Sequence, residues 1–153
     1  MNSFYRHIIL LLFVLLPLFL TVRHSFAAEG WAGCPDVTRF IEETDSKHKT
    51  WEDLYRLFNA YPGCDDGLYA EGYSDFVAQS LAKHWDNFHE LASLVGKDPT
   101  FRDFILRHID TTAAQGDLIT LLDNARTRCP SSSVLLCKEI EKAVLSAIDR
   151  LKK

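Results

Sequence analysis

Apolar residues recur every three or four positions along most of the chain beyond residue 34, a spacing that places them on one face of an α-helix. Prolines, glycines and polar clusters separate these runs, and no run alternates apolar and polar residues long enough to indicate a strand. The sequence therefore predicts an all-α fold, a single compact bundle of about six to seven short helices with short connections. The apolar faces are expected to contain Val37, Phe40 and Ile41; Trp51, Leu54, Tyr55 and Phe58; Tyr69, Tyr73, Phe76, Val77 and Leu81; Phe88, Leu91, Ala92 and Val95; Phe101, Phe104, Ile105 and Ile109; Leu118, Leu121, Leu122 and Ala125; and Cys137, Ile140, Val144, Ala147, Ile148 and Leu151.

Capping residues mark several of the predicted helix ends. Thr50 and Asp53 have the spacing of a capping box with an acidic third position, and the helix after them has an apolar face. Asp98 followed by Pro99 is a strong start signal, because an N-cap acceptor precedes a proline at the first helical position. The remaining signals are Pro35 as the first residue of a helix, a stop at Tyr61, Pro62 and Gly63, a third helix from about Leu68 to Trp85, a stop at Gly96 and a cap within Ser131–Ser133.

The first 27 residues differ in kind from the rest. Residues 8–20 contain no charged or hydrogen-bonding side chain, and basic residues precede them. A helix of this length spans about 20 Å, against roughly 30 Å of membrane hydrocarbon, and small residues stand at Ser25 and Ala27. These features are typical of a secretory signal peptide. We therefore predict a signal peptide over residues 1–27, cleaved after Ala27, a helical domain over residues 28–153, and a periplasmic or secreted location.

Two alternatives to a cleaved signal involve the membrane. The apolar run can be an uncleaved anchor, although Pro17 and the short span argue against it. Residues 31–34 resemble the end of a bacterial lipobox, in which the cysteine carries a lipid, although Trp31 stands where a lipobox usually has leucine. Membrane contact is therefore expected only through the export signal or, in the second alternative, through a lipid on Cys34.

Composition excludes several classes of protein. The chain has 153 residues, of which 47% are hydrophobic and 25% charged, which excludes disorder, collagen and a disulfide-dense mini-protein. The formal net charge is −4, but the 126 residues after the predicted signal hold 15 basic and 21 acidic residues and carry −6. The negative charge of this domain argues against nucleic acid or an anionic membrane as its main partner.

All four cysteines lie in the predicted mature part. An even number of cysteines in an exported chain indicates two disulfides, whereas buried free thiols are the plain alternative. Four cysteines allow three pairings, including a local link between the last two. We favour Cys64–Cys129 with Cys34–Cys137 as a hypothesis, because closing long loops removes more entropy from the unfolded chain.

Four carboxylates cluster at the predicted start of the third helix: Asp65, Asp66, Glu71 and Asp75. Asp65 or Asp66 is placed to cap that helix, where its dipole favours a negative charge. Glu71 and Asp75 are neighbours on one face, and like charges at this spacing slightly destabilise a helix. A basic partner, a cation or an arginine from another helix would offset that cost. The alternative is that the acidic face of the helix contacts only water and has no binding role. These four residues are the candidate partner-binding residues.

The sequence contains no recognisable catalytic or metal-binding motif. His84 and His89 are not at the spacing of a helical zinc pair, and the chain lacks a calcium-loop pattern, a Gly-x-Ser-x-Gly elbow and a phosphate-binding glycine loop. His108 stands near Asp110 but is expected at the margin of the core, without a catalytic partner. No catalytic residue, metal or cofactor is therefore predicted. The alternative is a hydrolase of cell-envelope material, with Glu71 and a neighbouring carboxylate as acid and base.

Three strings carry a resemblance to a family of small exported bacterial all-helical proteins. They are Cys-Asp-Asp-Gly-x-x-Ala-Glu-Gly-x-Ser-Asp from Cys64 to Asp75, Arg-His-Ile-Asp from Arg107 to Asp110, and the stretch over residues 124–130 that ends in Cys-Pro. The likeness covers residues 51–130 and implies no particular activity. The short, exported, disulfide-bonded layout is also similar to that of helical periplasmic immunity proteins, which block toxins delivered by type VI secretion.

These observations favour a non-enzymatic binding protein over an enzyme. The motive is the short acidic helical body with disulfides and no catalytic constellation. An inhibitor or immunity protein that binds a protein partner with a basic surface in the periplasm fits this description, because opposite charge speeds association.

Overall fold

The computed structural model describes residues 33–45 and 50–153, and within them the protein has seven α-helices, two short 3₁₀ turns and no strand. The predicted all-α fold with two disulfides is confirmed for this part of the chain. The predicted signal peptide and its cleavage point lie outside the described residues. The elements are α2 (Val37–Thr44), α3 (Trp51–Ala60), α4 (Gly67–Lys83), η3 (Trp85–Asn87), α5 (Phe88–Lys97), α6 (Pro99–Arg107), α7 (Gln115–Thr127), η4 (Ser131–Ser133) and α8 (Val134–Leu151).

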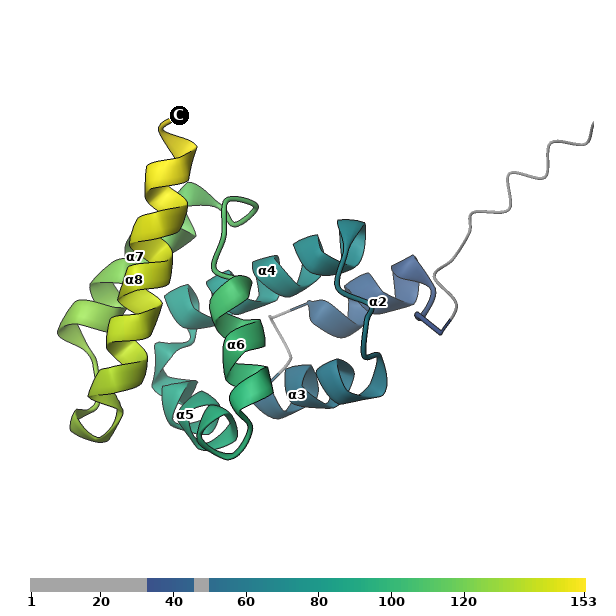
Figure 1. The fold of residues 1–153 in the computed structure, drawn as a ribbon, viewed down its shortest axis with the longest axis horizontal. Coiled ribbons are helices and arrows are strands. Elements are labelled where there is room, and N and C mark those ends of the chain that lie inside the picture. Colours follow the sequence, from purple (N-terminus) through teal and green to yellow (C-terminus); the bar gives the residue numbers. More distant parts are fainter. Residues whose placement is uncertain (1–32, 46–49) are drawn as a thin grey trace, which may run out of the picture. The chain divides into compact units, whose positions relative to one another are not determined.

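Helix α4 is the element on which the others are arranged. It packs against α2 on one side and α7 on another, while α5 packs against α3 and α6, and α8 packs against α7 and α6 (Figure 1). The second half of α4 carries apolar or small residues nearly all round, and a helix of this kind is stable only when it is buried. Phe76, Val77, Ala78 and Leu81 are indeed fully buried.

Aromatic rings join α4 to its neighbours. Tyr73 packs edge-on against Phe40 of α2 and Phe104 of α6, with ring centroids 4.8 and 4.9 Å away. Phe104 in turn lies 4.3 Å from the imidazole of His108. Edge-to-face pairs add to the stabilisation that burial alone provides. The core thus includes Tyr69 and Tyr73, as the helical spacing of apolar residues predicts.

Two of the predicted helix starts are confirmed by their hydrogen bonds. The Thr50 hydroxyl oxygen accepts from the backbone N–H of Asp53 at 3.2 Å, and the Asp53 carboxylate accepts from the Thr50 N–H at 2.9 Å. The Asp98 carboxylate accepts from the N–H groups of Thr100 and Phe101 at 2.9 and 3.1 Å. Each cap satisfies amide groups that the first turn of a helix leaves without an intrahelical partner.

Two other predicted helix ends are wrong, and the predicted cap within Ser131–Ser133 is confirmed in position only. Pro35 is not the first helical residue, because Asp36 caps α2 and accepts from two amide groups of its first turn, at 2.9 and 3.3 Å. Gly96 does not end α5, which continues to Lys97; Gly96 lacks the positive φ of a glycine at a left-handed helix end. Ser133 occupies the N-cap position of α8, but its side chain makes no capping hydrogen bond.

The disulfides are Cys34–Cys64 and Cys129–Cys137, with Cα separations of 5.6 and 6.1 Å. The favoured pairing of Cys64 with Cys129 and Cys34 with Cys137 is wrong. Loop entropy describes the unfolded chain, whereas the pairing depends on which cysteines the fold brings together. One pair joins the segments that precede α2 and α4, and the other closes the α7–α8 hairpin. With its sulfur bonded to Cys64, Cys34 has no thiol that could carry a lipid in this form.

Gly72 lies where α2 and α4 cross most closely. A Cβ atom at this position would be 2.8 Å from Cε1 of Phe40 and 3.3 Å from the hydroxyl oxygen of Thr44. Phe40 cannot move aside easily, because it is fully buried and its ring packs against the rings of Tyr69 and Tyr73. The close crossing explains a glycine in the middle of a helix.

We expect Gly72→Ala to lower the free energy of unfolding by about 1–2 kcal/mol, because the cost of overpacking exceeds the higher helix propensity of alanine. Gly96→Ala is the matched control: a Cβ there meets nothing within 4 Å, so the substitution should stabilise α5 by up to about 1 kcal/mol. Urea denaturation of both variants measures the two effects. A stabilised Gly72→Ala protein would contradict the close crossing.

Candidate functional site

The four predicted partner-binding carboxylates lie in two different environments. Asp65 is partly buried and points toward α6, whereas Asp66, Glu71 and Asp75 are exposed on or beside α4. Of the two predicted capping residues, Asp66 is the N-cap and accepts from the backbone N–H of Gly67 at 2.7 Å. Gly67 has a φ of +54°, which favours glycine and lets the chain turn sharply into α4.

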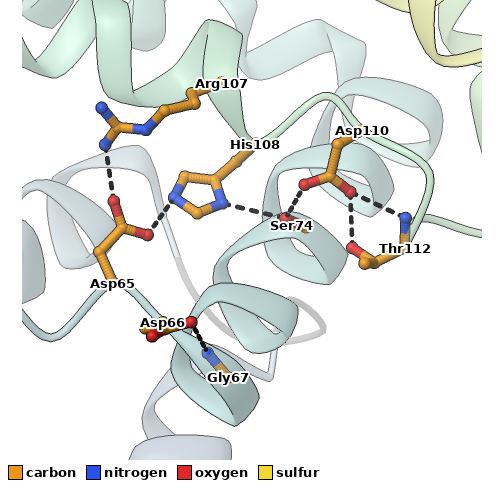
Figure 2. A network of polar contacts seen from close by, with 8 residues as sticks. All are labelled: Asp65, Asp66, Gly67, Ser74, Arg107, His108, Asp110 and Thr112. Atoms are coloured by element: carbon orange, nitrogen blue, oxygen red, sulfur yellow. Dashed lines mark hydrogen bonds and ion pairs between the residues drawn. The ribbon is translucent and has the colours of Figure 1, made fainter.

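Asp65 is held by two basic side chains at the end of α6 (Figure 2). Its Oδ2 accepts from a guanidinium N–H of Arg107 at 2.6 Å, and its Oδ1 lies 2.9 Å from Nε2 of His108. Arg107 is thus an arginine from another helix that compensates a carboxylate beside α4. The carboxylate is Asp65, however, and not the pair Glu71 and Asp75 for which such an arginine is expected. Oδ1 and Nε2 are within ion-pair distance, but the contact is an ion pair only when His108 is protonated, and Nε2 makes no well-directed hydrogen bond among the described residues.

His108 continues the contact into α4. Its Nδ1 lies 2.9 Å from the hydroxyl oxygen of Ser74, and that hydroxyl donates to Oδ2 of Asp110 at 3.0 Å (Figure 2). Oδ1 of Asp110 accepts from the backbone N–H and the hydroxyl of Thr112, at 2.8 and 2.6 Å. We call the residues Asp65, His108, Ser74 and Asp110 the polar chain. It joins the segment before α4, α4 itself and the loop between α6 and α7.

The polar chain is short of one hydrogen when both carboxyl groups are ionised and His108 is neutral. Its three consecutive contacts need three hydrogens, whereas a neutral imidazole and one hydroxyl supply two. Because the Ser74 hydroxyl donates to Asp110, the hydrogen of the imidazole belongs on Nδ1, toward Ser74. With the imidazole hydrogen on Nδ1, the contact between Nε2 and the Asp65 carboxylate is the one left without a hydrogen.

The pKa values in the polar chain reflect opposing influences. Burial lowers the pKa of His108 below its ordinary value, and the negative charge of Asp65 offsets this only in part. Burial is also the largest single influence on Asp110, where it acts to raise the pKa. Hydrogen bonds from Thr112 and Ser74 together outweigh it, and the pKa of Asp110 is lowered. His108 is thus neutral and Asp110 ionised at neutral pH.

A serine, a histidine and a carboxylate that contact one another in a row are the groups used in nucleophilic catalysis. In this protein, however, substrates cannot reach them. Ser74 has no exposed surface and His108 is 3% exposed. A nucleophile must reach a reacting carbon atom, and a sealed hydroxyl cannot. The position of His108 also corrects the prediction that it lies at the margin of the core. The chemistry open to the polar chain is to hold protons and to fix α4 against α6.

Glu71 and Asp75 have no basic partner among the described residues. Asp75 accepts from the side-chain amide of Gln79 at 2.7 Å. Glu71 is exposed, and it is not among the residues that line the hollows beside α2 and α3, beside α3 and α6, and beside α3 and α5 in the described part of the chain. The hydrolase alternative requires Glu71 in a cleft with a second carboxyl group at catalytic separation, and it stays a prediction.

Comparisons of this chain with protein-family models, with curated proteins and with solved structures find no match. The resemblances to exported bacterial proteins and to immunity proteins therefore stay predictions. Within the described ranges, no group of three or more His, Cys, Asp or Glu side chains is arranged to hold a metal ion. No helix in that part of the chain is both long and apolar enough to cross a membrane.

Proposed function

We propose that this protein is an exported, non-enzymatic binding protein of the inhibitor or immunity type, which acts on a protein partner in the periplasm. The observation that carries the proposal is the contrast between a sealed polar chain and an exposed, uncompensated acidic helix face. Ser74 and His108, the groups of the polar chain with nucleophilic character, are buried and hold helices together. Glu71 and Asp75, the carboxylates on the exposed face of α4, have no basic partner in the described part of the chain.

The two disulfides support export. Disulfides form and persist outside the reducing cytoplasm, and both of these connect segments of a small helical domain. The apolar run at residues 8–20 provides a signal for secretion. Together they make a periplasmic or secreted location the natural setting for binding.

The α4 acidic surface, which consists of Asp66, Glu71 and Asp75, is the proposed contact area. Leu68 lies on the same helix face as Glu71 and Asp75 and is 56% exposed, so an apolar side chain accompanies the charges. Aliphatic contact with a rim of charge is common in protein interfaces. A basic partner surface would be attracted over a distance, which raises the association rate more than the final affinity.

The double substitution Glu71→Lys/Asp75→Lys tests this surface. Tagged wild-type protein, exported in its native host, is used to retain a partner from periplasmic extract at low salt, and the retained protein is purified. We expect the double variant to associate with the partner at least about tenfold more slowly in surface plasmon resonance, because the charge of the surface is reversed.

The exported protein also tests the predicted cleavage after Ala27. Its N-terminal residue should be Ala28.

The matched control is Asp103→Lys/Asp123→Lys, which changes the net charge equally at exposed positions of α6 and α7. This control should retain the wild-type association rate at moderate salt, where distant surface charges are screened. An equal loss of association rate in both double variants would mean that the net charge of the protein, and not the α4 acidic surface, determines the rate. Unchanged binding by the α4 variant would remove the acidic surface from the proposal.

A further inference from the structure

A hollow of about 360 Å³ lies between the end of α3, the turn that follows it, α4 and α6. Phe58, Pro62 and Phe104 contribute apolar walls, while Asp65 and Arg107 stand among its polar lining residues. The guanidinium of Arg107 lies 5.9 Å from the centre of the Phe104 ring. Sites that bind small molecules in proteins have similar volumes and the same mixture of apolar walls with a few polar groups.

Tyr73 also lines this hollow, and the state of its hydroxyl is unusual. The residue is 1% exposed, and the hydroxyl has no hydrogen-bond partner among the described residues. Buried tyrosine hydroxyl groups usually find a partner, because a lone one costs about 1–3 kcal/mol. The ring is held on both sides by Phe40 and Phe104, so the hydroxyl cannot turn away to find one.

The charges around the hydroxyl indicate the kind of partner it would accept. Burial, and after it the negative charge of Asp65, raise the pKa of Tyr73, which therefore keeps its proton and acts as a donor. Asp65 and Tyr61, whose charges both act on the hydroxyl, line the same hollow, so the hydroxyl end of the ring lies toward it. An anion next to the hydroxyl would be repelled by Asp65, and the charge of Arg107 is already engaged by that carboxylate.

We propose that the hollow binds small uncharged molecules with an aromatic or aliphatic body and a carbonyl-type acceptor oxygen, which accepts a hydrogen bond from Tyr73. The body lies against Phe58, Pro62 and Phe104. The hydroxyl is covered in the unbound protein, so binding requires the rim to open, and Arg107, whose side chain is mostly exposed, moves aside as the ligand enters. The site does not depend on the α4 acidic surface, so either proposal can fail without the other.

Three probes of nearly equal shape test the proposal on the unmodified exported protein. Acetophenone has an aromatic ring and a neutral carbonyl, ethylbenzene lacks the oxygen, and benzoate carries a charge. In ¹⁵N NMR titrations we expect acetophenone to shift the backbone signals of Phe58, Tyr73 and Phe104, and to bind roughly fivefold or more tightly than the other two probes. Equal affinities, preference for benzoate, or shifts confined to other residues would overturn the proposal.

Tyr73→Phe removes the hydroxyl and keeps the ring. Since the hydroxyl is unpartnered, we expect this variant to melt at the same temperature as the wild type or higher. Its affinity for acetophenone should fall roughly fivefold, to that for ethylbenzene, while ethylbenzene binding is unchanged. Undiminished acetophenone binding would overturn the proposal, and so would a lower melting temperature without any carbonyl preference, because a trapped water then satisfies the hydroxyl.

Discussion

His108→Ala is expected to lower the free energy of unfolding at pH 7 by about 3–4 kcal/mol, because it leaves buried polar groups without their partner and opens a cavity. The imidazole separates Asp65 from Ser74, and it packs 4.3 Å from the ring of Phe104. Small domains are stable by only about 5–15 kcal/mol, so the loss is a large fraction of the total. Urea denaturation followed by circular dichroism measures it.

The pH dependence of stability distinguishes a proton-holding imidazole from a ring that merely fills space. The folded pKa of His108 is lowered by burial, so between that value and about 6.5 the unfolded chain binds more protons than the folded one. The contribution of His108 is then complete above about pH 6.5 and is lost as the pH falls toward the folded pKa. Asp110, with its lowered pKa, adds a second loss below about pH 3.8.

His108→Gln should therefore abolish the first loss and keep the second. The exposed residue His84 provides the control, since His84→Gln alters a side chain without a hydrogen bond in the described structure and should change stability little. If wild-type stability instead increases on acidification from pH 7 to 5, the attraction of Asp65 raises the pKa of His108 more than burial lowers it. The polar chain then gains its third hydrogen under mildly acidic conditions.

The order of the helices could be predicted from the sequence because each carries a local signal. The capping box at Thr50 and the Asp98–Pro99 start depend only on neighbouring residues, and both are observed. The sequence predicts less well which residues face the core at the edges of the fold. Ile41 and Leu151 have the spacing of inward residues, yet they are 54% and 43% exposed. Spacing indicates which side of a helix is apolar, but the width of the contact depends on how neighbouring helices cross it.

The polar chain could not be predicted from the sequence, because its members come from three separate segments. Ser74 and His108 are 34 residues apart, and the two strings that contain them do not indicate that they meet. The one available signal was a polar residue among the buried positions of α4, where Ser74 stands between Tyr73 and Phe76. Such a residue needs a partner in the core, but which partner it finds is decided by helix packing. The disulfide pairing escaped prediction for the same reason.

Cys34→Ala/Cys64→Ala is expected to lower the free energy of unfolding by about 3.5 kcal/mol, against about 2.5 kcal/mol for Cys129→Ala/Cys137→Ala, by the chain-entropy account of loop closure. The first disulfide spans 30 residues and the second 8. The first also has a local role, since α2 packs mainly against α4 and contributes only Phe40 and Thr44 as buried residues. Without the link, α2 should detach before the rest of the domain unfolds.

Hydrogen exchange tests this local role directly. In the Cys34→Ala/Cys64→Ala protein, the amides of α2 should exchange by local opening, while those of α7 and α8 still require global unfolding. In the Cys129→Ala/Cys137→Ala protein α2 should keep its protection relative to α4, which separates the local effect from a general loss of stability. Equal exchange of α2 and α7 in the first variant would mean that the Phe40 contacts alone hold α2. Cys34–Cys64 would then act only on the unfolded chain.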